Sequence, residues 1–211
     1  IKQAIKLKFG KQISISASIN SDIRRVAKLG KLNANQVIEN RVNQADKYSF
    51  AIKDLLLNLG LRRKNITIEC FDISHHGGKN AVASAVRFSS HGPEKNNYRL
   101  FNIPKEFSGN DIGSMKHVLE RRINKNSINP LPDIILIDGG KLQLEAALSA
   151  FSTLAKSSPM ILSIVKGSKR VRSTETIFSR DGIIEMTKDS PGFLLLQQIR
   201  DESHRRALTS N

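Results

Sequence analysis

The sequence predicts an α/β protein in which a mixed β-sheet is flanked by helices. Residues 66–72 (ITIECFD) alternate apolar and polar side chains, as a strand does. Residues 133–138 (DIILID) are an almost uninterrupted apolar run, which is typical of a central strand covered on both faces. Between them, residues 111–124 carry apolar side chains at helical spacing. A right-handed crossover through this helix would place the second strand parallel to the first, on its free edge.

Turn residues and periodicity predict the remaining elements of the sheet domain. Residues 81–89 and 97–103 are two further strands, expected to form an antiparallel meander with the first. Asn110 or Asp111 can cap the helix that comes next, and its expected buried positions are Ile112, Met115, Val118, Leu119 and Ile123. Beyond residue 138 we expect a helix (141–151), a short strand (160–166), a basic loop (168–173), a hairpin closed by Ser179 to Gly182, and a last helix that begins at Ser190-Pro191.

A strand-and-long-helix segment is expected to precede this sheet. Residues 4–18 alternate in the manner of an edge strand or hairpin. Residues 33–59 are typical of one long helix, entered through Asn33-Ala34-Asn35 and stopped at Gly60. The charged residues 61–65 form a hinge, so we divide the chain into an N-terminal connector, 1–62, and a sheet domain, 63–211.

The charge of the chain indicates a polyanionic partner. Thirty-four Lys and Arg residues against 19 Asp and Glu give a net charge of +15, which makes nucleic acid the leading candidate. A basic surface kept only for solubility is the alternative. No apolar run reaches 18 residues and no signal peptide is recognisable, so we expect a cytoplasmic protein without a membrane partner. The single cysteine, Cys70, lies inside a predicted strand and is expected to be a buried free thiol.

Two aspartates end the two predicted parallel strands. Asp72 follows one apolar strand and Asp138 the other, and adjacent strands lie about 4.8 Å apart. Carboxylates at such a short separation repel each other unless a proton or a cation lies between them. Mg²⁺ or Mn²⁺ is the natural counter-ion, and either suits phosphodiester chemistry. The structural alternative is that each aspartate only forms a turn, Asp72 before Ser74 and Asp138 before Gly139.

A histidine near the C-terminus is the third candidate at this site. His204 lies two turns beyond Leu196, near the apolar face that continues through Ile199, Ala207 and Leu208. An imidazole there can bind a metal or carry a proton. A packing role is the alternative. His75 and His76 are closer to Asp72 in sequence, and we expect them to serve the turn or to touch substrate.

Five strings in this sequence, FDISH, YRLFNI, NDIGSMKHVLERR, ILIDGGK and RDESHRRA, resemble in order and spacing the C-terminal nuclease half of the UvrC family of bacterial nucleotide excision repair. The resemblance implies an RNase H-like fold with an Asp-Asp-His active site that cuts the damaged strand on the 5′ side of a lesion. It transfers these roles to Asp72, Asp138 and His204, and adds Asp111, for which helix capping is a sufficient structural explanation.

The sequence also departs from the family pattern. Leu142 stands where the family often has glycine after the lysine of GGK, and Asn110 stands where it often has a second aspartate. The nuclease domain that makes the 3′ cut and the helix-hairpin-helix module of the family have no counterpart here. We therefore expect this chain to be a fragment of a longer protein.

The resemblance and the residues together predict metal-assisted hydrolysis of DNA. Asp72, Asp138 and His204 would hold Mg²⁺ or Mn²⁺. The expected partners are damaged duplex DNA and UvrB, with UvrA acting upstream. A non-catalytic nucleic-acid-binding module and an RNA-strand nuclease on the same fold are the alternatives. Basic residues expected to hold backbone phosphates, each otherwise explained as a solvated charge, are Lys141, Arg121, Arg122, Lys166, Lys169 and Arg170.

Overall fold

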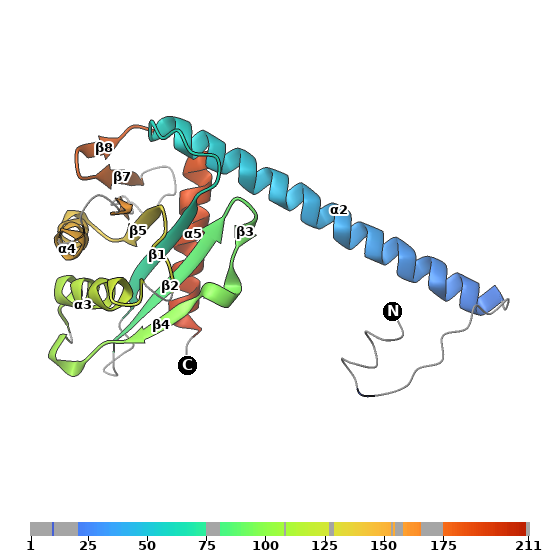
Figure 1. Cartoon of the computed structure of the whole chain (residues 1–211), viewed down its shortest axis with the longest axis horizontal. Coiled ribbons are helices and arrows are strands. Elements are labelled where there is room, and N and C mark those ends of the chain that lie inside the picture. The colour runs from blue at the N-terminus through green and yellow to red at the C-terminus, as the bar shows by residue number, and fades with distance from the viewer. Residues whose placement is uncertain are drawn as a thin grey trace. The chain divides into compact units, whose positions relative to one another are not determined.

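The computed structural model describes residues 10, 21–74, 81–107, 109–126, 129–152, 154, 158–165 and 175–209, with the side chains of residues 21–23 and 41 excepted. The chain divides into two units, residues 1–43 and 44–211. The second unit contains the whole sheet and the helices that cover it (Figure 1).

The long N-terminal helix begins earlier than the sequence predicts. Helix α2 spans Ser21–Asn58, so Asn33 and Asn35 lie inside it rather than at its start. Residues 24–32 are mostly good helix formers, and the single Gly30 costs only about 1 kcal/mol relative to alanine. The predicted stop is confirmed, because Gly60 has a φ of 65° and the amide of Leu61 donates to the carbonyl of Leu56 at 2.9 Å. The predicted hairpin at 4–18 falls outside the described residues, and the predicted boundary at residue 62 stays a prediction.

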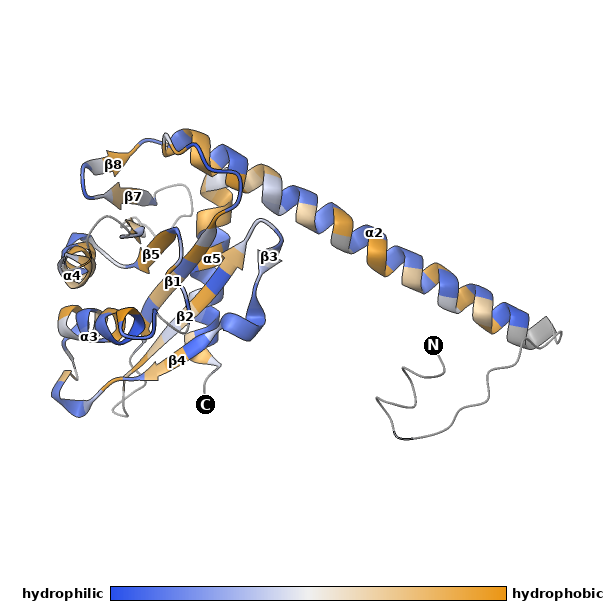
Figure 2. Ribbon diagram, viewed as in Figure 1, coloured by the Kyte–Doolittle hydropathy of each residue, from blue (hydrophilic) through white to orange (hydrophobic). Residues whose placement is uncertain are grey.

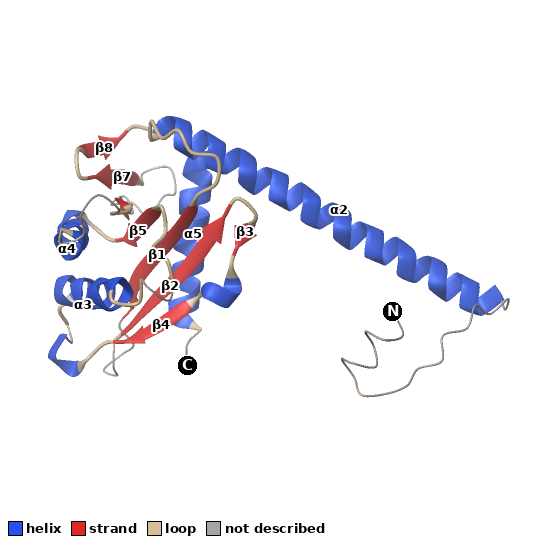
Figure 3. Cartoon of the chain, viewed as in Figure 1, coloured by secondary structure: helices blue, strands red, loops and turns tan. Residues whose placement is uncertain are grey.

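The predicted antiparallel meander is confirmed (Figure 3). Strand β1 spans Thr67–Ser74 and pairs antiparallel with β2, Val82–Ser89. Strand β2 in turn pairs antiparallel with β4, Arg99–Asn102, and with the two-residue strand β3, Gly92–Pro93. Short 3₁₀ turns at Lys95–Asn97 and Lys105–Phe107 lie on either side of β4 in the chain.

The predicted parallel pairing of two strands joined through a helix is also confirmed. Helix α3 spans Asp111–Ile123, and its cap is Asn110, whose side chain accepts a hydrogen bond from the amide of Gly113 at 2.9 Å. The chain then enters β5, Ile134–Asp138, which pairs parallel with β1 so that Ile68 faces Ile134 and Phe71 faces Ile137. This register brings the carboxyl ends of β1 and β5 to the same edge of the sheet.

The C-terminal third completes the sheet. Helix α4, Lys141–Phe151, leads to β6, Met160–Val165, which is parallel to β5. Strands β7, Thr176–Ser179, and β8, Gly182–Ile184, form the predicted hairpin. The strand order is β3-β2-β1-β5-β6-β7-β8, with β4 beside β2. Helix α5 spans Pro191–Leu208 and is capped by Ser190 as expected.

Helices cover both faces of the sheet. On one face Ile68, Cys70 and Leu136 pack against α5 and the last turns of α2. On the other, Phe71 and Ile137 pack against α3 and α4. The central strands are correspondingly apolar (Figure 2). The α/β fold class is therefore confirmed, and Cys70 is buried and free as expected.

Two expected core positions are exposed instead. Ile112 lies in the first turn of α3 and is 42% exposed, and Leu208 is the last residue of α5 and is 53% exposed. Within the described part of the chain, no helix combines the length and the apolarity needed to cross a membrane.

Candidate metal centre

Asp72 and Asp138 lie on the same face of the sheet. Asp72 is two residues from Cys70 on β1, and Asp138 is two residues from Leu136 on β5. Side chains alternate between the faces of a strand, so both carboxylates point to the face that α5 covers. Because Phe71 faces Ile137, Asp72 and Asp138 are the next residues along two neighbouring strands. Sequence reasoning from the strand ends predicted this juxtaposition.

Helix α5 adds an imidazole to the two carboxylates. The Nδ1 atom of His204 lies 3.1 Å from Oδ2 of Asp72, and the same oxygen accepts a hydrogen bond from the Ser74 hydroxyl at 3.0 Å. The side chain of Asp72 is 8% exposed and that of His204 is 45% exposed. The acid is thus fixed in the interior, while the imidazole lies where solvent or a substrate can reach it.

The three side chains have the geometry of a cation site. One ligand atom from each of Asp72, Asp138 and His204 lies within 4.8 Å of the others. Two ligands around one Mg²⁺ at 2.0–2.1 Å are about 2.9 Å apart when adjacent and about 4.2 Å apart when opposite, so a group within 4.8 Å can close on one cation by small side-chain movements. The two carboxylates suit Mg²⁺ or Mn²⁺, and the imidazole offers a further metal-ligand atom. The donor set therefore fits a divalent cation, and its identity as Mg²⁺ or Mn²⁺ stays a prediction.

The electrostatics of the site also favour a cation. Burial, and then the negative charges of Asp138 and Asp72, raise the pKa of the Cys70 thiol well above its ordinary value. The thiol stays protonated and is not a ligand. The two carboxylates place negative charge in the interior of the domain, which a bound cation would offset.

A buried ion pair fixes α5 against the rest of the domain. Arg200 lies one turn before His204, and its guanidinium bonds the carboxylate of Glu175 in the interior. Gln197 donates to the other oxygen of Glu175 at 2.6 Å. Neither Arg200 nor Glu175 was recognised from the sequence, because Glu175 immediately precedes β7 and lies 25 positions before Arg200 in the chain.

Asp111 occupies the start of α3 and is half-buried. It does not belong to the group of three that surrounds the candidate cation position. Asn110, rather than Asp111, makes the side-chain cap of this helix. Its expected catalytic role stays a prediction.

The structure corrects the role expected for Arg122. Its side chain is only 5% exposed, and Nε and Nη2 form a double hydrogen bond with Glu69 at 2.8 Å each. Further bonds run to the carbonyls of Asn129 and Pro130. Arg122 is therefore a structural residue and not a phosphate contact. The sequence contained the signal, because position 122 continues the helical spacing of Met115, Val118 and Leu119.

Arg121 and Lys141 remain exposed and can meet a polyanion. The Arg121 guanidinium lies 5.5 Å from the centre of the Phe101 ring and donates to the carbonyl of Asn102 at 3.2 Å. Lys141 begins α4, three residues after Asp138, and its ammonium lies 5.3 Å from the Phe178 ring. Lys166, Lys169, Arg170, His75 and His76 fall outside the described residues.

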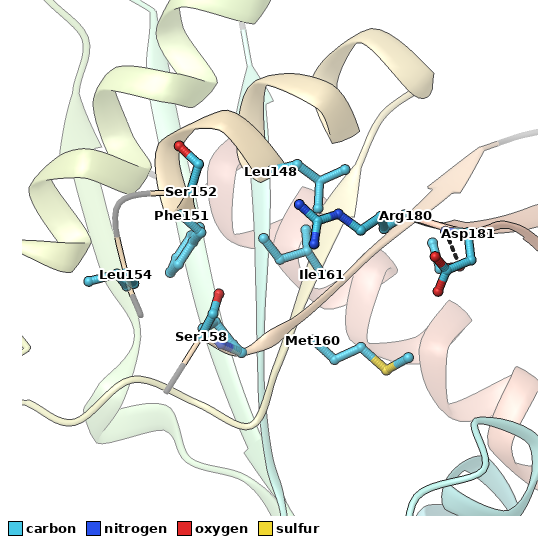
Figure 4. A pocket seen from close by; sticks show the side chains of 11 residues that line it. Leu148, Phe151, Ser152, Leu154, Ser158, Met160, Ile161, Arg180 and Asp181 are labelled. Atoms are coloured by element: carbon cyan, nitrogen blue, oxygen red, sulfur yellow. Dashed lines mark hydrogen bonds between the residues drawn. The ribbon is translucent and has the colours of Figure 1, made fainter. Parts of the chain in front are cut away.

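A pocket of about 370 Å³ lies apart from this site (Figure 4). It lies between the end of α4, the start of β6 and the turn of the β7–β8 hairpin, with Phe151, Met160 and Arg180 in its lining. Because Asp138 pairs with Ile164 near the end of β6, the pocket and the carboxylates occupy opposite ends of that strand.

Comparison with known proteins gives a consistent match. Residues 57–208 match the family model described as the UvrC RNase H endonuclease domain. Proteins named UvrABC system protein C are 37% identical in Yersinia enterocolitica, 38% in Photorhabdus laumondii and 37% in Pseudomonas protegens, each over 96% of this chain and 34% of the relative. The chain thus spans about a third of the length of these relatives.

Two solved structures are more distantly similar. A crystal structure of human ENDOV has a TM-score of 0.41 and 10% identity, over 69% of this chain and 85% of that one. A crystal structure of the catalytic domain of human Endonuclease V has a TM-score of 0.42 and 12% identity, over 69% and 83%.

Proposed function

This chain belongs to the family of UvrC RNase H endonuclease domains, and from that premise we propose that it hydrolyses a DNA phosphodiester on the 5′ side of a lesion in nucleotide excision repair. One observation carries the proposal. Asp72, Asp138 and His204, from two neighbouring strands and the last helix, present ligand atoms within 4.8 Å of one another. A set of two carboxylates and an imidazole at the carboxyl edge of a sheet suits a hard divalent cation.

Asp72 and Asp138 would hold Mg²⁺ or Mn²⁺, with His204 as a third ligand or as a proton carrier. Such a cation, when bound, lowers the pKa of a coordinated water and offsets negative charge on the phosphate. Asp72 is held in place by the Ser74 hydroxyl and by the His204 ring. Histidine side chains exchange protons near neutral pH, and the exposed ring of His204 can serve the attacking water or the leaving oxygen.

Phosphate contacts are proposed for exposed cations near the site. Arg121 and Lys141 support this role by their exposure and by the net charge of +15. The basic segment 166–172 comes after β6, whose end lies beside Asp138, and we keep Lys166, Lys169 and Arg170 as proposed contacts. UvrB, loaded on the lesion by UvrA, is the proposed partner that delivers the damaged duplex.

Metal binding tests the site directly. We expect Mn²⁺ titration of the chain to give saturable binding that Asp72→Asn and Asp138→Asn each abolish, because each variant removes one anionic ligand at constant size. Asp181→Asn is the matched control, since Asp181 lies in the β7–β8 turn, outside the candidate centre. Unchanged affinity in both site variants would sink the metal-site proposal.

Substrate choice separates the proposal from its alternatives. With the chain restored to the length of its relatives, we expect Mn²⁺-dependent nicking of a UvrB-bound lesion duplex, 5′ to the lesion, and little cleavage of an RNA/DNA hybrid. Preferential cleavage of the hybrid would indicate an RNA-strand nuclease. DNA binding without any metal-dependent cleavage would indicate a non-catalytic binding module.

A further inference from the structure

Two serine hydroxyls join α5 to the sheet beside the candidate metal centre. Ser84 is the direct partner of Asp72 in the β1–β2 register, and Ser203 immediately precedes His204. Both serines are fully buried. The Ser84 hydroxyl donates to the backbone carbonyl of Ser203 at 2.7 Å, and the two hydroxyl oxygens are 2.8 Å apart. The Ser203 hydroxyl also lies 3.3 Å from the carbonyl of Cys70, which is two residues before Asp72.

Each hydroxyl of this pair has at least one hydrogen-bond acceptor for its proton. A serine hydroxyl has one proton to donate and two lone pairs to accept. Ser84 gives its proton to the Ser203 carbonyl, so Ser203 donates either to the Ser84 oxygen or to the Cys70 carbonyl. Both buried hydroxyls are thereby satisfied, and α5 is bonded to β1 and β2 at one point.

The bonded carbonyl is the feature that links the pair to His204. It belongs to the peptide group whose nitrogen is the His204 amide, so the bond from Ser84 fixes the start of that residue in space. Helix α5 runs along β1 and β2 on this face (Figure 1). Rotating a helix by 10° about its axis moves a side-chain tip by about 1 Å, given a radius of about 5–6 Å. A shift of that size would separate the imidazole from Asp72.

We propose that Ser84 and Ser203 are positioning residues, which set the distance between the His204 imidazole and the Asp72 carboxylate. The inference rests on the proposed function, because it assigns these serines to the centre that Asp72 and His204 form. It differs from a packing role in a way that can be measured. Alanine at position 84 keeps the volume nearly unchanged and removes the hydrogen bond to the Ser203 carbonyl.

The test uses Ser84→Ala in the whole 211-residue chain. Its matched control is Ser114→Ala, because Ser114 is equally buried and its hydroxyl also donates to a backbone carbonyl, that of Phe107 at 3.2 Å. Two quantities are measured for each variant that melts cooperatively. One is the ring ¹⁵N chemical shifts of His204 in metal-free protein at one fixed pH, which report the bond to Asp72. The other is the affinity for Mn²⁺.

We expect Ser84→Ala to change the His204 ring shifts and to weaken Mn²⁺ binding roughly tenfold or more, as loss of a group that orients a ligand does. Ser114→Ala should change neither. If Ser84→Ala does not fold, Ser84→Cys serves in its place, because its thiol is only a weak donor to the Ser203 carbonyl. Unchanged ring shifts in the folded serine variant would overturn the positioning role. Altered ring shifts in a chain that binds no Mn²⁺, wild type included, would leave the positioning role standing and reject the metal-site proposal instead.

Discussion

His204 and Asp72 are 132 positions apart in the chain, yet Nδ1 of one lies 3.1 Å from Oδ2 of the other. Asp72 comes from the first strand of the sheet and His204 from the last helix. The contact therefore forms only when the first and last elements of the domain have come together. The candidate centre is a property of the whole fold, and a substitution far from it can abolish it.

Substitution of His204 by asparagine tests the chemical role of the imidazole apart from its contact with Asp72. Asparagine can place its amide nitrogen near the position of Nδ1 but has no counterpart of Nε2. We expect His204→Asn and His204→Ala both to slow Mn²⁺-dependent nicking by about 100-fold or more, the usual size of a lost proton-transfer group. Initial nicking rates on a lesion duplex measure this. His117→Ala is the control, since His117 lies on α3, away from α5, where its ring contacts that of Phe107. A His204→Asn variant with the wild-type rate would contradict the prediction.

Substitution of Arg122 should mainly lower the stability of the domain, whereas substitution of its neighbour Arg121 should mainly affect DNA binding. Removing Arg122 leaves the buried Glu69 carboxylate without its ion-pair partner, and breaking a buried pair in this way lowers the free energy of unfolding by about 3–5 kcal/mol. We expect the lower end, because Arg87 also contacts Glu69 at 2.9 Å. Arg121→Ala should change stability by less than about 1 kcal/mol and reduce the salt dependence of DNA binding by about one unit of slope. Urea unfolding and DNA titrations at several salt concentrations test both, and a stable, weakly binding Arg122→Ala variant would count against this assignment.

The sequence was sufficient to predict the positions of the two carboxylates for a physical reason. Local patterns in the chain are enough to predict the alternation of the strands, the helix cap at Asn110 and the apolar strand 134–137. Because side chains alternate between the faces of a strand, these patterns also fix the face to which Asp72 and Asp138 point. The spacing on the last helix made His204 a candidate without distinguishing a ligand from a packing residue, and the resemblance to the UvrC family then favoured the ligand role.

The features that the sequence did not predict depend on partners distant in the chain. The ion-pair partner of Arg122 is Glu69, 53 positions earlier, and the Ser84–Ser203 contact joins residues 119 positions apart. The start of α2 at Ser21 was missed because Asn33 and Asn35 resemble caps, whereas a continuous run of helix formers before them carries the helix through.

The last turns of α2 should be required for the domain to fold. Ile52, Leu55 and Leu56 are buried against the same face of the sheet as α5. Each such side chain contributes about 1.5–3 kcal/mol, so losing three removes an amount comparable with the 5–15 kcal/mol that stabilises a typical domain. We expect a version beginning at residue 44 to unfold cooperatively and one beginning at residue 63 to lack a cooperative transition. Equal melting temperatures for the two would support the boundary at residue 62 and contradict this expectation.

Gly192 tests the same contact by a single substitution. A Cβ at this position, in the first turn of α5, would lie 2.6 Å from the backbone nitrogen of Leu55, and the Gly192 amide donates to Asp54 at 2.8 Å. Backbone cannot move aside as a flexible side chain does, so Gly192→Ala should cost about 1–3 kcal/mol, as overpacking does.

Gly30→Ala is the matched control: no atom lies within 4 Å of its added Cβ, and alanine should stabilise that helix by about 1 kcal/mol. If thermal unfolding shows Gly192→Ala to be as stable as wild type, α2 and α5 do not pack as closely as this contact requires. A loss confined to Gly192→Ala, accompanied by weaker Mn²⁺ binding, would instead connect the α2–α5 contact to the position of His204 at the other end of the same helix.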